Sequence, residues 1–197
     1  MIGNYIKAVA TAVSRSTAKL MKTGQTTSYR TGDDGDLEAG RNTSFTVLAE
    51  NNPFGNTNRF TSELGTQTYT NNIVIDWSTY DGSTVLGWKR TFTAGGTTWD
   101  YSIDNALLVS IAPYTTGWRL PNIGEYIAIA NLELTQRFNY SPFNIIASNF
   151  WSSTTNVNNT TYAYQFVNNS FALSELKVYS ARFLAVRTFT VTGTTLS

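Results

Sequence analysis

Four acidic side chains lie within six positions of one another, close enough in sequence to bind one metal ion together. Asp33, Asp34, Asp36 and Glu38 carry oxygen ligands of the kind that Ca²⁺ prefers. Their spacing departs from the EF-hand loop, because no glycine stands at its sixth position. A tight turn of glycine and aspartate, whose carboxylates accept backbone N–H bonds, explains the same residues. We favour the turn, expect no cofactor, and keep Asp33, Asp34 and Asp36 as the candidates for a calcium site.

The chain contains neither histidine nor cysteine. Without histidine it lacks the usual general base, the commonest neutral metal ligand and any Ser-His-Asp triad. Without cysteine it lacks thiol nucleophiles, disulfides and thiolate zinc sites. Its thirteen acids could still provide the carboxylate pair of a glycoside hydrolase, although no local motif supports one. We therefore expect no enzymatic activity and keep a glycoside hydrolase as the lesser alternative.

A polar segment rich in asparagine and tyrosine offers a surface for ligand binding. Tyrosine supplies contact area and asparagine supplies adaptable hydrogen bonds at a modest cost in entropy, as in antibody paratopes. Leu173, Leu176 and Val178 interrupt this segment, and a solvated loop without a partner is the alternative. The candidate ligand-binding residues are Asn156, Asn158, Asn159, Tyr162, Tyr164, Asn168, Asn169 and Tyr179.

Composition limits the class of protein. The 197 residues fit one domain, alone or with an arm, and can bury a sizeable core. Only 14 % of them are charged, below the roughly 25 % of an ordinary soluble domain, and neutral hydroxyl and amide side chains take their place. Such surfaces are common in extracellular and virion proteins. A net charge of +1 gives no electrostatic footprint for DNA or RNA, so we expect no nucleic-acid partner.

The first 22 residues are expected to form an arm. Ile6, Val9, Val13 and Leu20 recur at spacings that favour an amphipathic helix, which could attach the protein to a neighbour or oligomerise it. A first strand or a loose tail is the alternative. The N-terminus lacks the apolar core of a signal peptide, and no segment approaches the roughly 18 apolar residues that span a bilayer. We expect no membrane insertion.

Two helices and several strands must position the remaining candidates. Apolar spacing predicts helices near 99–112, capped by Thr98, and near 122–131, where Asn122 and Glu125 fit a capping box. Ile123, Ile127, Ala130 and Leu134 are the expected core face of the second helix. The expected strands are 72–77, 85–89, 118–121, 162–167 and 183–191.

Three short motifs carry a family resemblance. They are W-R-L-P-N-I-G-E at 118–125, W-S-S-T at 151–154 and V-R at 186–187, and T-G-Q-T-T-S-Y at 23–29 adds weaker support. Together they resemble a bacterial and phage family of the C-type-lectin-like superfamily, which is known from the C-terminal domains of collagen-like adhesins. The resemblance implies an α+β domain of two helices and a mixed, mainly antiparallel sheet over 23–192, with an arm over 1–22 and a tail over 193–197.

The motif residues are expected to be structural. Trp118 and Trp151 could stack on a sugar, but in this context we expect core positions for both indoles. Arg119 and Arg187 could clamp an anion, but a pair with Glu125 or a backbone carbonyl is favoured. The structural motif residues are Trp118, Arg119, Pro121, Glu125, Trp151 and Arg187. In retroelement-diversified members of this fold, the residues between W-S-S-T and the final V-R form the ligand-binding face.

The resemblance implies display and binding. A phage particle reconciles this role with the missing export signal, because it is assembled in the host cytoplasm and released by lysis. We expect a virion-surface protein, such as a head fibre, decoration or tail adsorption protein. It would contact other virion proteins through its arm, form a homo-oligomer, with a trimer as our choice, and bind a host carbohydrate or protein. A retroelement-diversified or secreted bacterial adhesin domain, located outside the cell, is the alternative.

Overall fold

The computed structural model describes residues 27–28, 31, 52–92, 95–145 and 149–197. The predicted arm over 1–22 and the calcium candidates Asp33, Asp34 and Asp36 lie outside these residues. Within them, no helix has the length and apolar character needed to cross a membrane.

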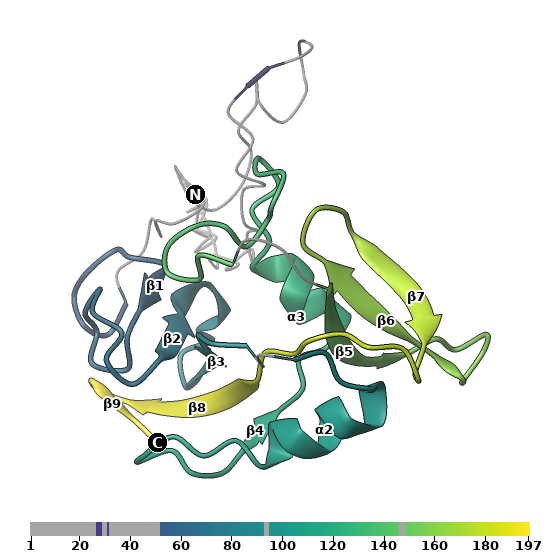
Figure 1. The fold of residues 1–197 in the computed structure, drawn as a ribbon. Coiled ribbons are helices and arrows are strands. Elements are labelled where there is room, and N and C mark those ends of the chain that lie inside the picture. The colour runs from purple at the N-terminus through teal and green to yellow at the C-terminus, as the bar shows by residue number, and fades with distance from the viewer. Residues whose placement is uncertain (1–26, 29–30, 32–51, 93–94, 146–148) are drawn as a thin grey trace, which may run out of the picture.

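The larger of two antiparallel sheets has six strands in the order β1–β2–β3–β8–β4, with β9 added to β8 (Figure 1). Strand β8 is central, because it pairs with β3 along one side and with β4 and β9 elsewhere. Gly87 of β3 lies opposite Arg187 of β8. The strands are β1 (Phe60–Thr61), β2 (Ile73–Asp76), β3 (Thr84–Lys89), β4 (Trp118–Arg119), β8 (Val186–Thr192) and β9 (Thr195–Leu196).

The smaller sheet has three strands in the order β5–β6–β7 and extends away from the larger one (Figure 1). Helix α3 lies between the sheets, and helix α2 contacts β4 and β5. The predicted α+β class is therefore confirmed for the described residues. The elements are β5 (Asn149–Thr155), β6 (Tyr162–Val167), β7 (Ala172–Leu176), α2 (Trp99–Leu107), α3 (Ile123–Ala128) and the 3₁₀ turn η1 (Trp77–Thr79).

Helix α3 begins at the predicted capping box. Asn122 Oδ1 accepts the Glu125 N–H at 2.9 Å, and a Glu125 carboxylate oxygen accepts the Asn122 N–H at 2.8 Å. The helix is shorter than predicted, because the backbone leaves helical geometry at Ile129. The predicted core face is also wrong in part. Ile127 is 41 % exposed, whereas Tyr126 and Ile129 are buried.

Helix α2 also ends earlier than its apolar spacing predicts. The chain turns at Leu108, so Ile111 lies beyond the helix and pairs with Tyr114. Leu107, the last residue of the helix, is 59 % exposed. Thr98 is the N-cap residue, but its side chain makes no capping bond; its carbonyl instead accepts a bond from the Ser102 hydroxyl at 2.9 Å.

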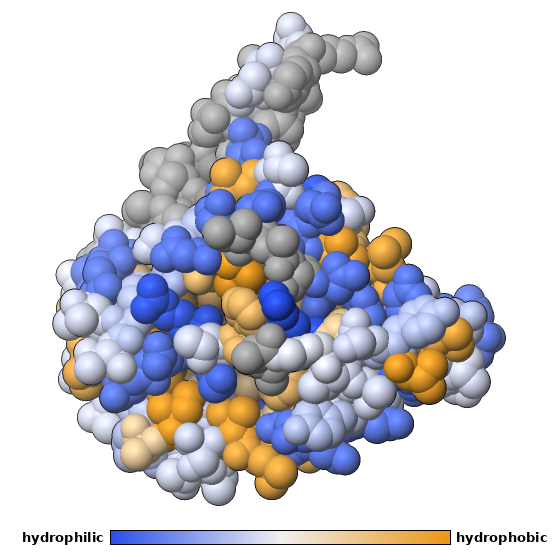
Figure 2. Space-filling view, in the orientation of Figure 1, coloured by the Kyte–Doolittle hydropathy of each residue, from blue (hydrophilic) through white to orange (hydrophobic). Residues whose placement is uncertain are grey.

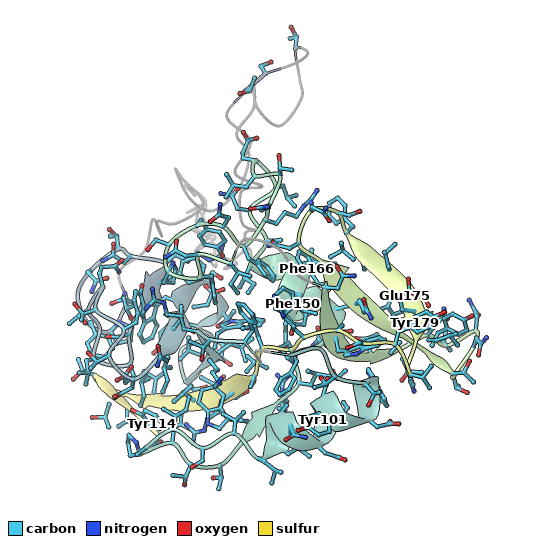
Figure 3. The ribbon with its side chains drawn as sticks, in the orientation of Figure 1. Tyr101, Tyr114, Phe150, Phe166, Glu175 and Tyr179 are labelled. Carbon is cyan, nitrogen blue, oxygen red and sulfur yellow. The ribbon has the colours of Figure 1, made fainter. Side chains whose placement is uncertain are left out.

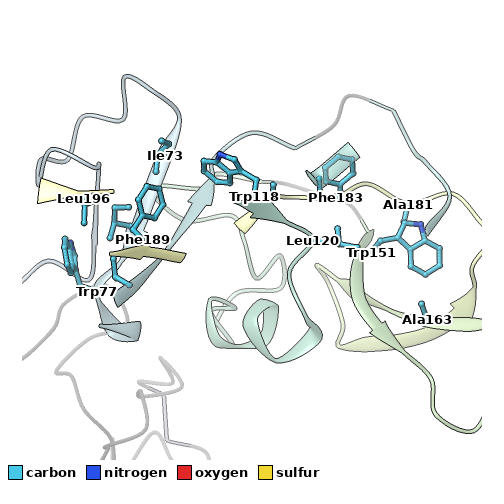
Figure 4. Packing of buried hydrophobic residues seen from close by; sticks show 14 residues of the cluster. Ile73, Trp77, Trp118, Leu120, Trp151, Ala163, Ala181, Phe183, Phe189 and Leu196 are labelled. Carbon is cyan, nitrogen blue, oxygen red and sulfur yellow. The ribbon is translucent and has the colours of Figure 1, made fainter. Parts of the chain in front are cut away.

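Two apolar clusters hold the sheets and helices together. The first runs from Trp77 of η1 and Phe189 of β8 to Trp151 of β5 (Figure 4). The second is centred on Tyr126 of α3, whose ring lies 5.8 Å from Trp88 of β3 and 5.9 Å from Phe166 of β6. Because Tyr126 contacts both sheets, α3 fixes the smaller sheet against the larger one.

Candidate binding surface

The three motif segments meet in space. Trp118 of β4 lies opposite Arg187 of β8 in the larger sheet. Two residues after β4, the Pro121 carbonyl accepts the Ser153 N–H at 2.8 Å, and the next turn adds a bond from the Ile123 N–H to Thr154 Oγ1 at 3.1 Å. These contacts join the start of α3 to both sheets. Segments far apart in the sequence therefore form one structural unit.

Both motif tryptophans are enclosed by protein. Trp118 is 1 % exposed and donates its indole N–H to the Tyr114 carbonyl at 2.8 Å. Trp151 is 0 % exposed and donates to the Thr97 carbonyl at 2.8 Å. Neither ring presents a face to solvent, so neither can stack on a ligand without unfolding.

The two motif arginines make different contacts. Arg119 binds Glu125 through two hydrogen bonds of 2.6 and 2.8 Å, which raise the pKa of Arg119. Arg187 Nε donates to the Thr116 carbonyl at 2.8 Å, and its guanidinium lies 4.5 Å from the Phe189 ring centroid. Partial burial lowers the pKa of Arg187. Both arrangements are the structural pairings that the sequence favours over an anion clamp.

Most of the predicted ligand-binding residues gather at the outer end of the smaller sheet. The turn between β5 and β6 carries Asn156, Asn158 and Asn159, and the turn after β7 carries Tyr179. A bond from the Lys177 N–H to the Thr161 carbonyl, at 3.0 Å, holds the two turns side by side. Figure 3 shows Tyr179 at this outer end, with Phe150 and Phe166 deeper in the molecule.

Two of these asparagines build the turn. Asn156 Oδ1 accepts the Asn158 N–H at 2.9 Å, while its Nδ2 donates to Ser174 Oγ of β7 at 2.8 Å. Asn159 Oδ1 accepts both the backbone N–H and the hydroxyl of Thr161. Their side-chain oxygens are therefore committed to the fold, as in other Asx turns.

The other polar groups at this end are available. The Asn158 side chain and the hydroxyls of Tyr162, Tyr164 and Tyr179 make no hydrogen bond with any described residue. Two valines flank them: Val157 is 89 % exposed and Val178 is 73 % exposed. Figure 2 shows apolar residues among polar ones at this end of the molecule. We call this set the tip surface: Val157, Asn158, Tyr162, Tyr164, Val178 and Tyr179.

The structure buries Asn168, contrary to its prediction as a ligand-binding residue, and places Asn169 apart from the tip surface. Asn168 is 1 % exposed; its Oδ1 accepts the Phe138 N–H at 2.7 Å and its Nδ2 donates to the Ile145 carbonyl at 2.9 Å. The buried side chain is therefore structural. Asn169 is exposed in the turn between β6 and β7, at the opposite end of these strands.

Sequence reasoning treated Val178 as an interruption and overlooked Val157. A single valine between polar or aromatic residues of a turn is the signal that could have identified both: Val157 stands between Asn156 and Asn158, and Val178 between Lys177 and Tyr179. In the part of the chain that the structure describes, no three acidic side chains converge into a group that could hold a metal ion. Comparison with protein-family models and with curated proteins finds no match to this chain.

Proposed function

We propose that this chain is a non-enzymatic binding protein on the surface of a phage virion, built on a C-type-lectin-like domain. The meeting of the W-R-L-P, W-S-S-T and V-R segments supports the domain assignment, because a family signature of this kind describes residues that fold against one another. The absence of histidine and cysteine from the sequence supports a role in binding rather than in acid–base or thiol chemistry.

The tip surface is the observation that carries the binding function. It combines three tyrosine hydroxyls and the Asn158 carboxamide, all without partners among the described residues, with the exposed side chains of Val157 and Val178. Exposed apolar side chains bordered by adaptable polar groups are typical of recognition surfaces. A firmly hydrogen-bonded pair of turns presents these groups, which limits the entropy lost on binding.

A host-surface carbohydrate or protein is the ligand class that we propose. Tyrosine rings suit the C–H faces of sugars, and hydroxyl and amide groups suit their oxygens. One tip offers only a small contact area, so useful affinity requires several copies held together. The arm over 1–22 would provide this by joining the chains into a homo-oligomer, a trimer in our proposal, and by docking them onto other virion proteins.

Binding is tested with the full-length protein on host cells, comparing two matched tyrosine variants. Tyr179 and Tyr101 are 54 % and 53 % exposed, but Tyr101 lies on α2 outside the tip surface (Figure 3). Tyr179→Ala should weaken cell binding about tenfold, as for an interface tyrosine. Tyr101→Ala should bind as the natural sequence does. Equal binding by all three proteins would refute the tip surface as the site.

The location is tested separately on purified phage particles. Mass spectrometry should find this chain in the particles, and deletion of residues 1–22 should remove it from them while leaving the domain folded. Full occupancy of the truncated chain would show that the arm is not the anchor. Absence of the intact chain from particles, together with its presence at the cell surface, would favour the bacterial adhesin instead.

A further inference from the structure

A pocket of about 440 Å³ lies beyond the end of β3, outside the tip surface. Its volume falls within the roughly 300–1,000 Å³ of ordinary small-molecule sites. Polar residues line part of it and apolar residues the rest. The lining residues used below are Asn72, Arg90, Phe92, Phe143, Asn144 and Ile145.

Arg90 is held in place while part of its guanidinium stays uncommitted. Its Nε donates to the Pro142 carbonyl at 2.7 Å, and its Cζ lies 5.4 Å from the Tyr69 ring centroid. Its two terminal nitrogens make no hydrogen bond or ion pair with any described residue. A fixed guanidinium with free terminal N–H groups has the geometry that binds a carboxylate through two parallel bonds.

Two asparagines with unusual backbone conformations border the same pocket. Asn72 has φ = 57° and Asn144 has φ = 53°, and these are the two non-glycine residues of the described chain with positive φ. Asparagine tolerates this region better than most residues, but the conformation still has an energetic cost, and such residues concentrate at ligand-binding positions. Both side chains are exposed, and neither makes a hydrogen bond with a described residue.

The inner part of the pocket is apolar. Phe143 and Ile145 line it and are 4 % and 2 % exposed, so each contributes a small apolar area. Phe92 lies beside them, and the Arg182 guanidinium is 4.8 Å from the Phe92 ring centroid. A ligand here therefore meets aromatic and aliphatic side chains, two carboxamides and the Arg90 guanidinium.

We propose that this pocket binds an acidic monosaccharide. The ligand carboxylate would pair with the terminal nitrogens of Arg90, and its ring hydroxyls would bond to Asn72 and Asn144. The C–H face of the ring would lie against the apolar wall. A neutral sugar would leave Arg90 unpaired, and a simple carboxylate would leave both carboxamides unused. This site is separate from the tip surface, and its existence does not depend on the function proposed above.

The test compares two probes that differ at one carbon. Methyl β-D-glucuronide carries a carboxylate where methyl β-D-glucoside carries a hydroxymethyl group. Each is titrated into the full-length, isotope-labelled protein and followed through backbone amide NMR signals. The glucuronide should shift the signals of Asn72, Phe92 and Asn144 and bind about tenfold or more tightly than the glucoside, since a hydrogen bond to a charged group is at stake. Equal affinities, or no shift at these residues, would overturn the proposal.

Two kinds of variant identify the groups responsible. Arg90→Gln should weaken glucuronide binding about tenfold or more and remove the preference over the glucoside. Asn72→Gly and Asn144→Gly keep the positive φ while removing the carboxamide, so they test the side chains without strain. Each should weaken binding about two- to tenfold, the range for a neutral hydrogen bond.

Thr190→Ala is the matched control, because this exposed residue pairs with Thr84, roughly 20 Å along β3 from Arg90. It should bind the glucuronide unchanged. If Arg90→Gln does not fold, the two glycine variants decide, and unchanged binding in both overturns the proposal. Tyr179→Ala should leave glucuronide binding intact, so failure of the tip surface and failure of this pocket give different results.

Discussion

Arg59 and Asp76 form an ion pair that is closed to solvent and joined by two hydrogen bonds of 2.9 Å, Nε to Oδ1 and Nη2 to Oδ2. Nη2 also donates to the Ala128 carbonyl at the end of α3, at 2.8 Å. Burial lowers the pKa of Arg59, but Asp76 raises it by more, so the net shift is upward. The pair therefore links β2 to α3 as a charged unit.

Breaking this pair should be costly. We expect Arg59→Met and Asp76→Leu each to reduce the free energy of unfolding by about 3–5 kcal/mol, because each leaves a buried group without its partner. The double variant Arg59→Met/Asp76→Leu should lose much less than the sum. Urea denaturation of the four proteins measures the coupling. Additive losses would show that the two side chains act independently.

Two substitutions of Glu125 distinguish the stabilisation from the capping box from that of the Arg119–Glu125 ion pair. Glu125→Gln keeps an acceptor for the Asn122 N–H but removes the charge, and should cost less than about 1 kcal/mol because the Arg119 side chain is 40 % exposed. Glu125→Ala removes both interactions and should cost about 1–2 kcal/mol. Thermal and urea unfolding give both values. A larger loss for the glutamine variant than for the alanine variant would contradict this assignment.

Core and surface aromatics should respond in opposite ways. Trp118→Ala should lower the free energy of unfolding by about 3–5 kcal/mol, because it leaves a cavity in the first apolar cluster. Tyr179→Ala should change it by less than about 0.5 kcal/mol, because this side chain is mostly exposed. Urea denaturation measures both. If Trp118→Ala keeps its stability but loses ligand binding, the indole is a binding platform and the core assignment is wrong.

Alkaline conditions should unfold the protein through its buried tyrosines. Burial raises the pKa of Tyr69 to about 12, and it also raises the pKa values of Tyr126 and Tyr140 well above the ordinary tyrosine value. The folded state thus retains protons that the unfolded state releases near pH 10, so stability is full below that pH and falls above it. Unfolding free energies and phenolate absorbance across this range measure the effect.

Tyr126→Phe provides the control for this pH dependence. The variant lacks the hydroxyl that accepts the Leu184 N–H at 3.2 Å, so it should be less stable at neutral pH. Its stability should fall less steeply above pH 10 than that of the natural sequence, because one shifted group is gone. Identical slopes would exclude Tyr126 from the transition.

Local signals account for the parts of the fold that could be predicted. The capping bonds of α3 join Asn122 and Glu125, three residues apart, so the sequence alone specifies them. Strands β2 and β3 were predicted from short apolar runs with a turn between them. The boundaries of α2 and α3 were less predictable, because tertiary packing decides where each helix ends. The buried face of α3 is centred on Tyr126, an aromatic residue that contacts both sheets.

The parts that could not be predicted depend on distant partners. Asn168 resembles its exposed neighbours in sequence, but its bonds reach Phe138 and Ile145, which are 30 and 23 residues away. Nothing near Arg90 in the sequence indicates that Asn144 lines the same pocket. For the tip surface, composition identified the segment, while the fold determined which side chains within it remain available.

The central position of β8 has a consequence for synthesis of the protein. Gly87 and Arg187 are paired neighbours in the larger sheet, yet one hundred residues separate them in the chain. The ribosome therefore completes β3 and β4 long before β8, the strand that lies between them, exists. The larger sheet cannot be completed while the chain is still short. Long-range pairing of this kind folds slowly and leaves strand edges open to other chains. The chain is therefore most prone to aggregate before residue 186 has left the ribosomal exit tunnel.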